Sequence, residues 1–272
     1  MRRALGLLLM TVIFVGSSLG CCAHMGLPFS LSTSERVERL DGVTVALVHE
    51  YKGKSHVFCT GVFVSSTVIM TAGHCVRGLA NRLGEEAALD GGASPFEIGL
   101  GLAEVPVIPP ESIAVPFIVK GEVMGVGESP IREHLTYVLS LSNEYDLALL
   151  KIVGEIPLHG IARLADKSPG VGEKLYIVGH PHGLTYTHTE GNVGAYRVKL
   201  PEAEDDKAMA GPYLQVSAPV WKGNSGGGAF NEEGELIGIC SFMVGVPNSS
   251  FFVHLDTLRG MMIGAKLLKI NI

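Results

Sequence analysis

A succession of short apolar and β-branched runs, separated by turn residues, most constrains how this chain can fold. The 35 glycines and 14 prolines are scattered along the sequence, which favours many tight turns between short strands. A helical period is expected only near the C-terminus, over residues 255–269. The pattern therefore predicts an all-β protein with one C-terminal helix. The expected strands are 43–50, 56–64, 68–71, 113–119, 135–141, 147–153, 174–178, 193–199, 213–217, 228–230, 236–243 and 250–253.

Residues 1–24 are typical of an export signal. Two arginines precede an apolar stretch from Ala4 to about Val15, and small residues follow. This stretch is shorter than the roughly 20 residues that a membrane-spanning helix needs, which favours cleavage. Two alternatives stay open, an uncleaved anchor and lipidation of Cys21 in "SLGC", and either would attach the chain to a membrane. We expect an exported protein that is periplasmic, extracellular or anchored in the cell envelope.

Composition and a loop-like break in the strand pattern predict the domain organisation. Hydrophobic residues make up 47% of the 272-residue chain, enough for an ample core, and the net charge of −6 argues against a nucleic-acid partner. A loop-like break at 154–172 divides two strand-rich halves, and we take it as the linker between two β-barrels. After a linker at 25–34, one domain is expected over 35–272. Its parts are an N-terminal barrel at 35–157, a C-terminal barrel at 158–254 and the helix at 255–269.

The cysteines fall into groups by position. Cys59 and Cys75 bracket two predicted strands, and the turn at 65–67 between them would bring the two thiols together. Because export permits disulfides, we predict a Cys59–Cys75 bridge. Cys240 stands apart and is expected to be a small buried hydrophobic residue.

Ser225 lies in "KGNSGGGAF", which fits two catalytic patterns. As G-x-S-x-G it fits the nucleophile elbow of α/β-hydrolases, and as G-N-S-G-G it fits the nucleophile loop of two-barrel serine proteases. An elbow needs a helix after the serine, whereas the following residues predict a hairpin with its turn at 231–234. An elbow also needs its acid and its histidine after the serine, and the only histidine and the only aspartate there are His254 and Asp256, two residues apart. This spacing is poor for a triad, and the hydrolase alternative is disfavoured.

A serine nucleophile needs a general base and a group that orients it. His74 in "TAGHC" ends a strand among small residues, and Asp146 in "NEYDLALLKI" directly precedes an apolar strand. Together with "GNSGGG", these motifs resemble the trypsin/chymotrypsin-like serine peptidase family, in its order of His, Asp and Ser, over residues 35–258. The spacing of the two cysteines also matches a disulfide of that family. The stretches "LQVSAPVWKGNSGG" and "IVGHPHGL" are most similar to its bacterial HtrA-like branch.

The resemblance implies two antiparallel six-stranded β-barrels of the chymotrypsin type. It also implies a serine endopeptidase that acts on polypeptides, with no metal or cofactor. Ser225 would attack the carbonyl, His74 would move its proton, and Asp146 would hold the imidazole tautomer. The N–H groups of Gly223 and Ser225 would form the oxyanion hole. The alternative is a non-catalytic surface or binding protein on the same scaffold.

The resemblance also predicts the substrate-binding residues. Residues 241–243 would pair with substrate backbone, and two segments, 218–221 and 240–243, would line the S1 pocket. Neither segment contains an acidic residue that could receive Lys or Arg, so we expect a small or aliphatic P1 residue. The expected substrate-binding residues are Pro219, Val220, Trp221, Ser241, Phe242 and Met243.

Two departures from well-known relatives, and one group of histidines, lead to further expectations. Asn224 stands where digestive members have an aspartate that pairs with a newly freed amine, so we expect no trypsin-style zymogen activation. The chain after Ser225 is too short for the PDZ module of HtrA proteins, so we expect none. The histidines of "HPHGLTYTH" could ligate a metal, but we interpret that loop as structural and expect no metal site. They are His180, His182 and His188.

Overall fold

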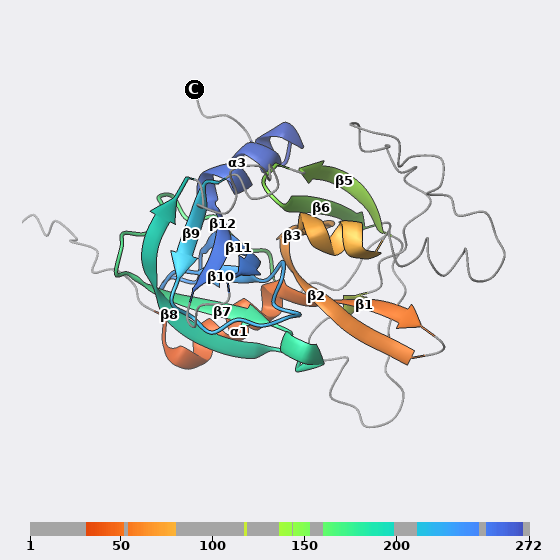
Figure 1. The fold of residues 1–272 in the computed structure, drawn as a ribbon, viewed down its shortest axis with the longest axis horizontal. Coiled ribbons are helices and arrows are strands. Elements are labelled where there is room, and N and C mark those ends of the chain that lie inside the picture. The colour runs from red at the N-terminus through yellow and green to blue at the C-terminus, as the bar shows by residue number, and fades with distance from the viewer. Residues whose placement is uncertain are drawn as a thin grey trace, which may run out of the picture.

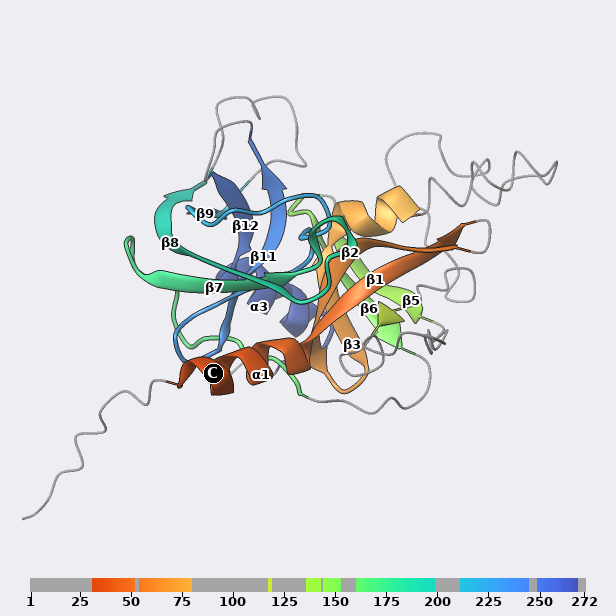
Figure 2. The same ribbon diagram turned by 90° about the horizontal axis from the view of Figure 1, so that it is seen from below.

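The computed structural model describes residues 31–51, 54–79, 117–118, 136–142, 144–152, 160–198, 211–244 and 249–268. Two β units lie side by side, and an N-terminal helix runs along both of them (Figures 1 and 2). The expected export signal with Cys21, and most of the expected strand at 113–119, lie outside the described residues. The described part contains no helix long and apolar enough to cross a membrane.

The first unit is a six-stranded antiparallel sheet with the order β4-β1-β2-β3-β6-β5. Its inner face buries apolar side chains such as Leu47, Phe63 and Ile69, each at most 1% exposed. We expected a closed barrel here. Among the described residues the two end strands, β4 and β5, do not pair with each other, and the sheet is open. The strands are β1 (Thr44–Tyr51), β2 (Lys54–Ser65), β3 (Val68–Ala72), β4 (Phe117–Ile118), β5 (Thr136–Ser142) and β6 (Leu147–Ile152).

The second unit is a closed six-stranded barrel with the order β10-β11-β12-β9-β8-β7. The hairpin expected after the serine motif is present as β10 and β11, which pair in antiparallel fashion. Residues 160–172 contain no strand, apart from a bridge between Leu164 and Leu236. The strands are β7 (Lys174–Gly179), β8 (Thr187–Arg197), β9 (Tyr213–Val216), β10 (Gly228–Phe230), β11 (Leu236–Met243) and β12 (Ser250–His254).

Helix α1 (Thr33–Val43) corrects the expectation that helical structure occurs only at the C-terminus. It begins inside the segment 25–34 that was expected to be a linker. Ser32 and Glu35 form a capping box, in which each side chain binds the backbone N–H of the other. Residues 33–39 are largely exposed and only the last turn is buried, so the helix lacks the continuous apolar stripe that marks a helix in a sequence. The sequence signal for this helix start was "STSE", in which a serine is followed three residues later by a glutamate, as in a capping box.

Three further boundaries differ from those expected. Residues 73–79, directly after β3, are helical, although only a strand end was predicted there. Strand β8 begins six residues before the expected start. Its first half is polar and carries no apolar alternation, so no sequence signal marked that part. Helix α3 (Leu255–Gly264) ends before residue 269, because Lys266 adopts a left-handed φ of 59° and Leu267 N–H donates to the Met262 carbonyl, as in a Schellman motif.

Candidate active site

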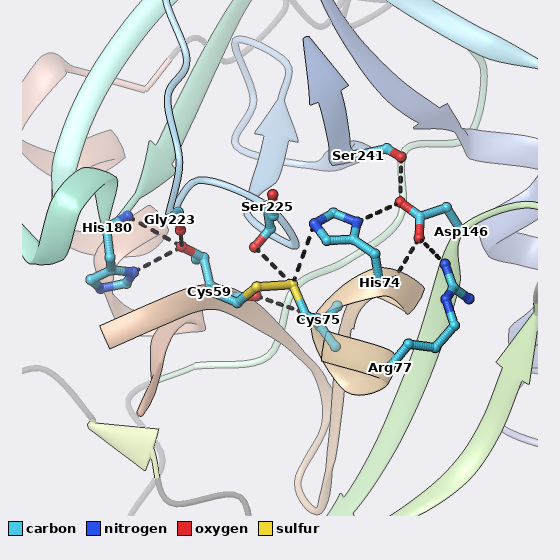
Figure 3. The surroundings of a disulfide bond; sticks show 11 residues. Cys59, His74, Cys75, Arg77, Asp146, His180, Gly223, Ser225 and Ser241 are labelled. Carbon is cyan, nitrogen blue, oxygen red and sulfur yellow. Dashed lines mark hydrogen bonds and ion pairs between the residues drawn. A yellow bond between two sulfur atoms is a disulfide. The ribbon is translucent and has the colours of Figure 1, made fainter. Parts of the chain in front are cut away.

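Strand pairing brings His74 and Asp146 together although 72 residues separate them in sequence. Ala72 at the end of β3 pairs with Leu147 at the start of β6, so the residues that flank these positions face one another. His74 Nδ1 lies 2.8 Å from Asp146 Oδ2. The imidazole is 43% exposed, whereas the carboxylate is only 8% exposed. The pair therefore has a buried acid and a ring that solvent or a substrate can reach (Figure 3).

The Asp146 carboxylate accepts four hydrogen bonds. Its Oδ1 accepts from the His74 backbone N–H at 2.7 Å and from Arg77 Nη2 at 2.9 Å. Its Oδ2 accepts from His74 Nδ1 and, at 2.5 Å, from Ser241 Oγ on β11. Burial raises the pKa of Asp146, but the hydrogen bonds and charge of His74 and the Ser241 hydroxyl outweigh it, and the net pKa is lowered. An ionised acceptor places the imidazole proton on Nδ1 and leaves Nε2 free to accept one.

The backbone around Asp146 is shaped for this contact. Asp146 has a positive φ of 50°, and its carbonyl accepts the Gly73 N–H at 2.9 Å. A Cβ at Gly73 would lie 3.0 Å from the Leu147 backbone nitrogen, so the two segments pack too closely for a side chain. Gly73 therefore lets the first turn of the helical segment 73–79 lie directly against Asp146.

Ser225 lies in the loop before β10, at the junction of the two β units. Its carbonyl accepts the Thr60 N–H at 2.8 Å, which ties the loop to β2. Cys75 Sγ lies 3.7 Å from the same carbonyl oxygen and 3.9 Å from His74 Nε2, so the serine and the imidazole are neighbours across the disulfide (Figure 3). Within the described chain no hydrogen bond joins Ser225 Oγ to His74. In unliganded proteases this contact is often long and tightens when substrate binds.

The loop at 222–227 turns two N–H groups away from the contacts that its carbonyls make. The Lys222 carbonyl accepts from His182 N–H at 2.9 Å, and the Asn224 carbonyl accepts from Gly227 N–H at 2.8 Å. Because a trans peptide points its C=O and N–H in opposite directions, the N–H groups of Gly223 and Ser225 face the other way. Neither has an acceptor within the described residues. Gly223 has a φ of 103°, and a Cβ there would lie 2.3 Å from the His180 carbonyl oxygen, so the position requires glycine.

Thr60 supports this loop from β2 and was missed in the sequence. It is fully buried, and its hydroxyl donates to the Gly223 carbonyl at 2.7 Å. The same oxygen accepts from the His180 N–H at 3.2 Å and lies 3.1 Å from His180 Nδ1. No local pattern marks Thr60, because its partners are 120 and 163 residues away. Arg77 was missed for the same reason.

The predicted Cys59–Cys75 disulfide is present. It joins β2 to the helical segment 73–79, beside His74. Cys240 is a buried free thiol, as expected, and burial together with the Asp146 charge raises its pKa to about 12. Among the described residues, the cluster of three potential metal ligands consists of this disulfide and His74, and bonded sulfurs are poor ligands.

The predicted substrate-binding residues divide into exposed and buried groups. Pro219, Trp221 and Met243 are exposed, with Trp221 54% accessible. Val220 and Ser241 are buried, and the Ser241 hydroxyl is used by Asp146. The remaining residue, Phe242, is half-buried and stacks on Phe251 with ring centroids 4.9 Å apart.

The three histidines considered as metal ligands contact different partners. His180 is fully buried on Thr60, and burial lowers its pKa to about 4 despite the opposing charge of Asp41. His182 lies near Trp221, with ring centroids 6.0 Å apart. His188 Nε2 lies 2.7 Å from Asp41 Oδ1 on α1, a carboxylate partner that the local sequence did not reveal.

Comparison with known proteins identifies the family of this arrangement. A model of the trypsin-like peptidase domain matches residues 59–239, about two thirds of the chain. The chain belongs to the trypsin-like peptidase domain family. The match begins at the first cysteine of the disulfide and includes all three motifs named from the sequence.

Curated relatives match shorter stretches of the chain. A probable periplasmic serine endoprotease DegP-like from Hahella chejuensis is 34% identical over 137 residues, which cover 48% of this chain and 28% of the relative. A protein of the same name from Brucella suis is 41% identical over 100 residues, covering 35% and 18%. The chain thus spans less than a third of the length of these relatives.

Two solved structures share the fold at low identity. An inactive form of a mutant of Rv3671c from M. tuberculosis H37Rv has a TM-score of 0.58 at 15% identity, covering 87% of this chain and 93% of that one. The serine endoprotease from Yersinia pestis has a TM-score of 0.57 at 19% identity, covering 86% and 66%. Both support the two-unit architecture.

Proposed function

We propose that this protein is an exported serine endopeptidase. The observation that carries the proposal is the His74–Asp146 pair, whose free Nε2 borders the Ser225 loop, in a chain of the trypsin-like peptidase family. The N-terminal part, residues 35–157, would supply His74 and Asp146, and the part at 158–254 would supply Ser225. Curated relatives with the word periplasmic in their names support a cell-envelope location.

In the proposed reaction, the Ser225 hydroxyl attacks the peptide carbonyl and gives its proton to His74 Nε2. The carbonyl oxygen becomes an oxyanion and accepts hydrogen bonds from the N–H groups of Gly223 and Ser225. His74 then gives the proton to the departing amine, and an acyl-serine remains. Water, deprotonated by His74, attacks this ester and releases the acid. Asp146 holds the ring and stabilises the imidazolium throughout.

The substrate is proposed to be a polypeptide with a small or aliphatic P1 residue. Trp221 is exposed in the segment just before Ser225, and Met243 is exposed at the end of β11, the strand whose Cys240 binds the loop of Ser225, so both could contact substrate side chains. A single methylene in such a pocket changes binding by only about 1 to 3 kcal/mol, so discrimination among aliphatic residues would be modest. A digest of a proteome-derived peptide library would measure the preference.

Labelling with a fluorophosphonate tests the proposal. The folded wild type is expected to react, and Ser225→Ala should lose both the label and peptidase activity, with kcat falling on the order of 10⁶-fold. Ser34→Ala, on the exposed face of α1, is the matched control and should label like the wild type. A folded wild type that takes no label would refute the peptidase and favour the non-catalytic scaffold.

A further inference from the structure

Arg77 makes direct contact with the acid of the candidate triad. Its Nη2 lies 2.9 Å from Asp146 Oδ1, and its side chain is 33% exposed. It lies three residues after His74 in the helical segment 73–79, so both side chains reach the same carboxylate from one helical turn. Figure 3 shows the guanidinium at Oδ1, the carboxylate oxygen that the imidazole does not contact. The carboxylate is therefore shared between two cationic partners when His74 is protonated.

The local packing is fitted to this guanidinium. A Cβ at Gly73 would lie 3.0 Å from Arg77 Nη1, so a side chain there would crowd the arginine. Gly73 is also held to Asp146 by a backbone hydrogen bond. The arginine is thus part of the close packing around the acid and is not a loose surface charge.

Among the described residues, the other groups around the pair are neutral or face solvent. On β11, Ser241 is a hydroxyl and Cys240 a thiol whose pKa is raised to about 12, so it stays uncharged. The Cys59–Cys75 disulfide lies on the β2 side of the pair, and the Ser225 loop contributes a second hydroxyl. The other charges that the described chain places near these loops are Glu144, which is exposed and bonded to Tyr145, and Lys222, which is exposed in the loop before Ser225. Arg77 is thus the cation of the described chain that touches the buried carboxylate.

We propose that Arg77 is a positioning residue that shares the charge of Asp146 and so limits how strongly this carboxylate stabilises protonated His74. A positive charge on Oδ1 opposes a second positive charge on the imidazole across the same carboxylate. The acid limb of the kcat/KM profile therefore lies at lower pH than it would without Arg77. This inference rests on the proposed function, because it concerns the pH range of the same triad.

The pH profile of kcat/KM for wild type and Arg77→Gln tests the inference. The acid limb of the variant should move to higher pH by roughly 0.5 to 1 unit at low salt. The difference should shrink at 1 M salt, because the arginine is partly exposed and is screened. Arg77→Lys should restore most of the wild-type limb. Arg163→Gln, which removes an exposed arginine paired with Asp166, is the matched control and should leave the limb unchanged.

Two outcomes would overturn the inference. One is an acid limb at the wild-type position in a folded Arg77→Gln variant that still labels at Ser225. The other is failure to fold of both Arg77→Gln and Arg77→Met, which would assign Arg77 a structural role. If the wild type itself has no Ser225-dependent activity, the proposed function fails instead. The fluorophosphonate label tells these cases apart.

Discussion

Replacing Thr60 with valine would test whether a buried hydroxyl on β2 holds the candidate oxyanion loop. Valine has nearly the shape of threonine, so the core around this fully buried position should repack little. The change removes the donor to the Gly223 carbonyl and the acceptor for the His180 N–H. These two backbone groups would then be buried without a hydrogen bond, and His180 Nδ1 would lose its contact with the same oxygen.

The magnitude follows from these two groups. Each buried polar group left unpaired costs about 1 to 3 kcal/mol, so the free energy of unfolding should fall by about 2 to 6 kcal/mol. The Gly223 carbonyl would also lose its anchor, and the adjoining Lys222–Gly223 peptide, which carries the Gly223 N–H, would be less well held. One oxyanion donor is typically worth 10²- to 10³-fold in kcat, so partial loss of its position should lower kcat by about 10- to 100-fold.

Urea unfolding and peptidase kinetics of Thr60→Val would measure both effects. Thr44→Val is a matched control, because the Thr44 hydroxyl also donates 2.7 Å to a backbone carbonyl in a buried setting, but at the end of α1. The control should lose about 1 kcal/mol of stability and retain its kcat. If folded Thr60→Val keeps a kcat within about twofold of wild type, the hydroxyl does not hold the loop and the reasoning is refuted.

The remaining predictions concern the disulfide and a buried histidine. Replacing Cys59 and Cys75 together with serine should lower the free energy of unfolding by about 3 kcal/mol, since the bridge closes a loop of 16 residues; an unchanged urea midpoint would contradict this. His180 stays neutral in the folded state down to about pH 4, whereas an unfolded histidine protonates near pH 6.5, so the unfolded state binds more protons between these values. Stability should therefore fall as the pH drops through this window, by about 3 kcal/mol in total, and His180→Asn should remove this part of the pH dependence. Equal pH slopes of unfolding free energy for the two proteins would show that His180 is not its source.

Local patterns were enough to predict most of the strands and the disulfide. Alternating apolar residues and glycine turns mark a strand within its own few residues, so β10, β11 and their hairpin could be expected from "GGAFNEEGELIGICSF". The pairing of Cys59 with Cys75 follows from a short strand pair whose turn brings the ends together. Helix α1 was missed because an exposed helix has no apolar stripe, although its capping box was visible in the sequence.

At the candidate site, the sequence was enough to predict the reactive residues, whereas the fold determines which side chains form hydrogen bonds with them. His74, Asp146 and Ser225 could be named as candidates because each stands in a recognisable local motif. Arg77 on Asp146 and Thr60 on Gly223 could not be named, since these contacts join residues 69 and 163 positions apart. Such contacts depend on how β3 pairs with β6 and how the second barrel lies against β2. A residue's local surroundings set its backbone preferences, but the packing of distant strands determines which polar groups it meets.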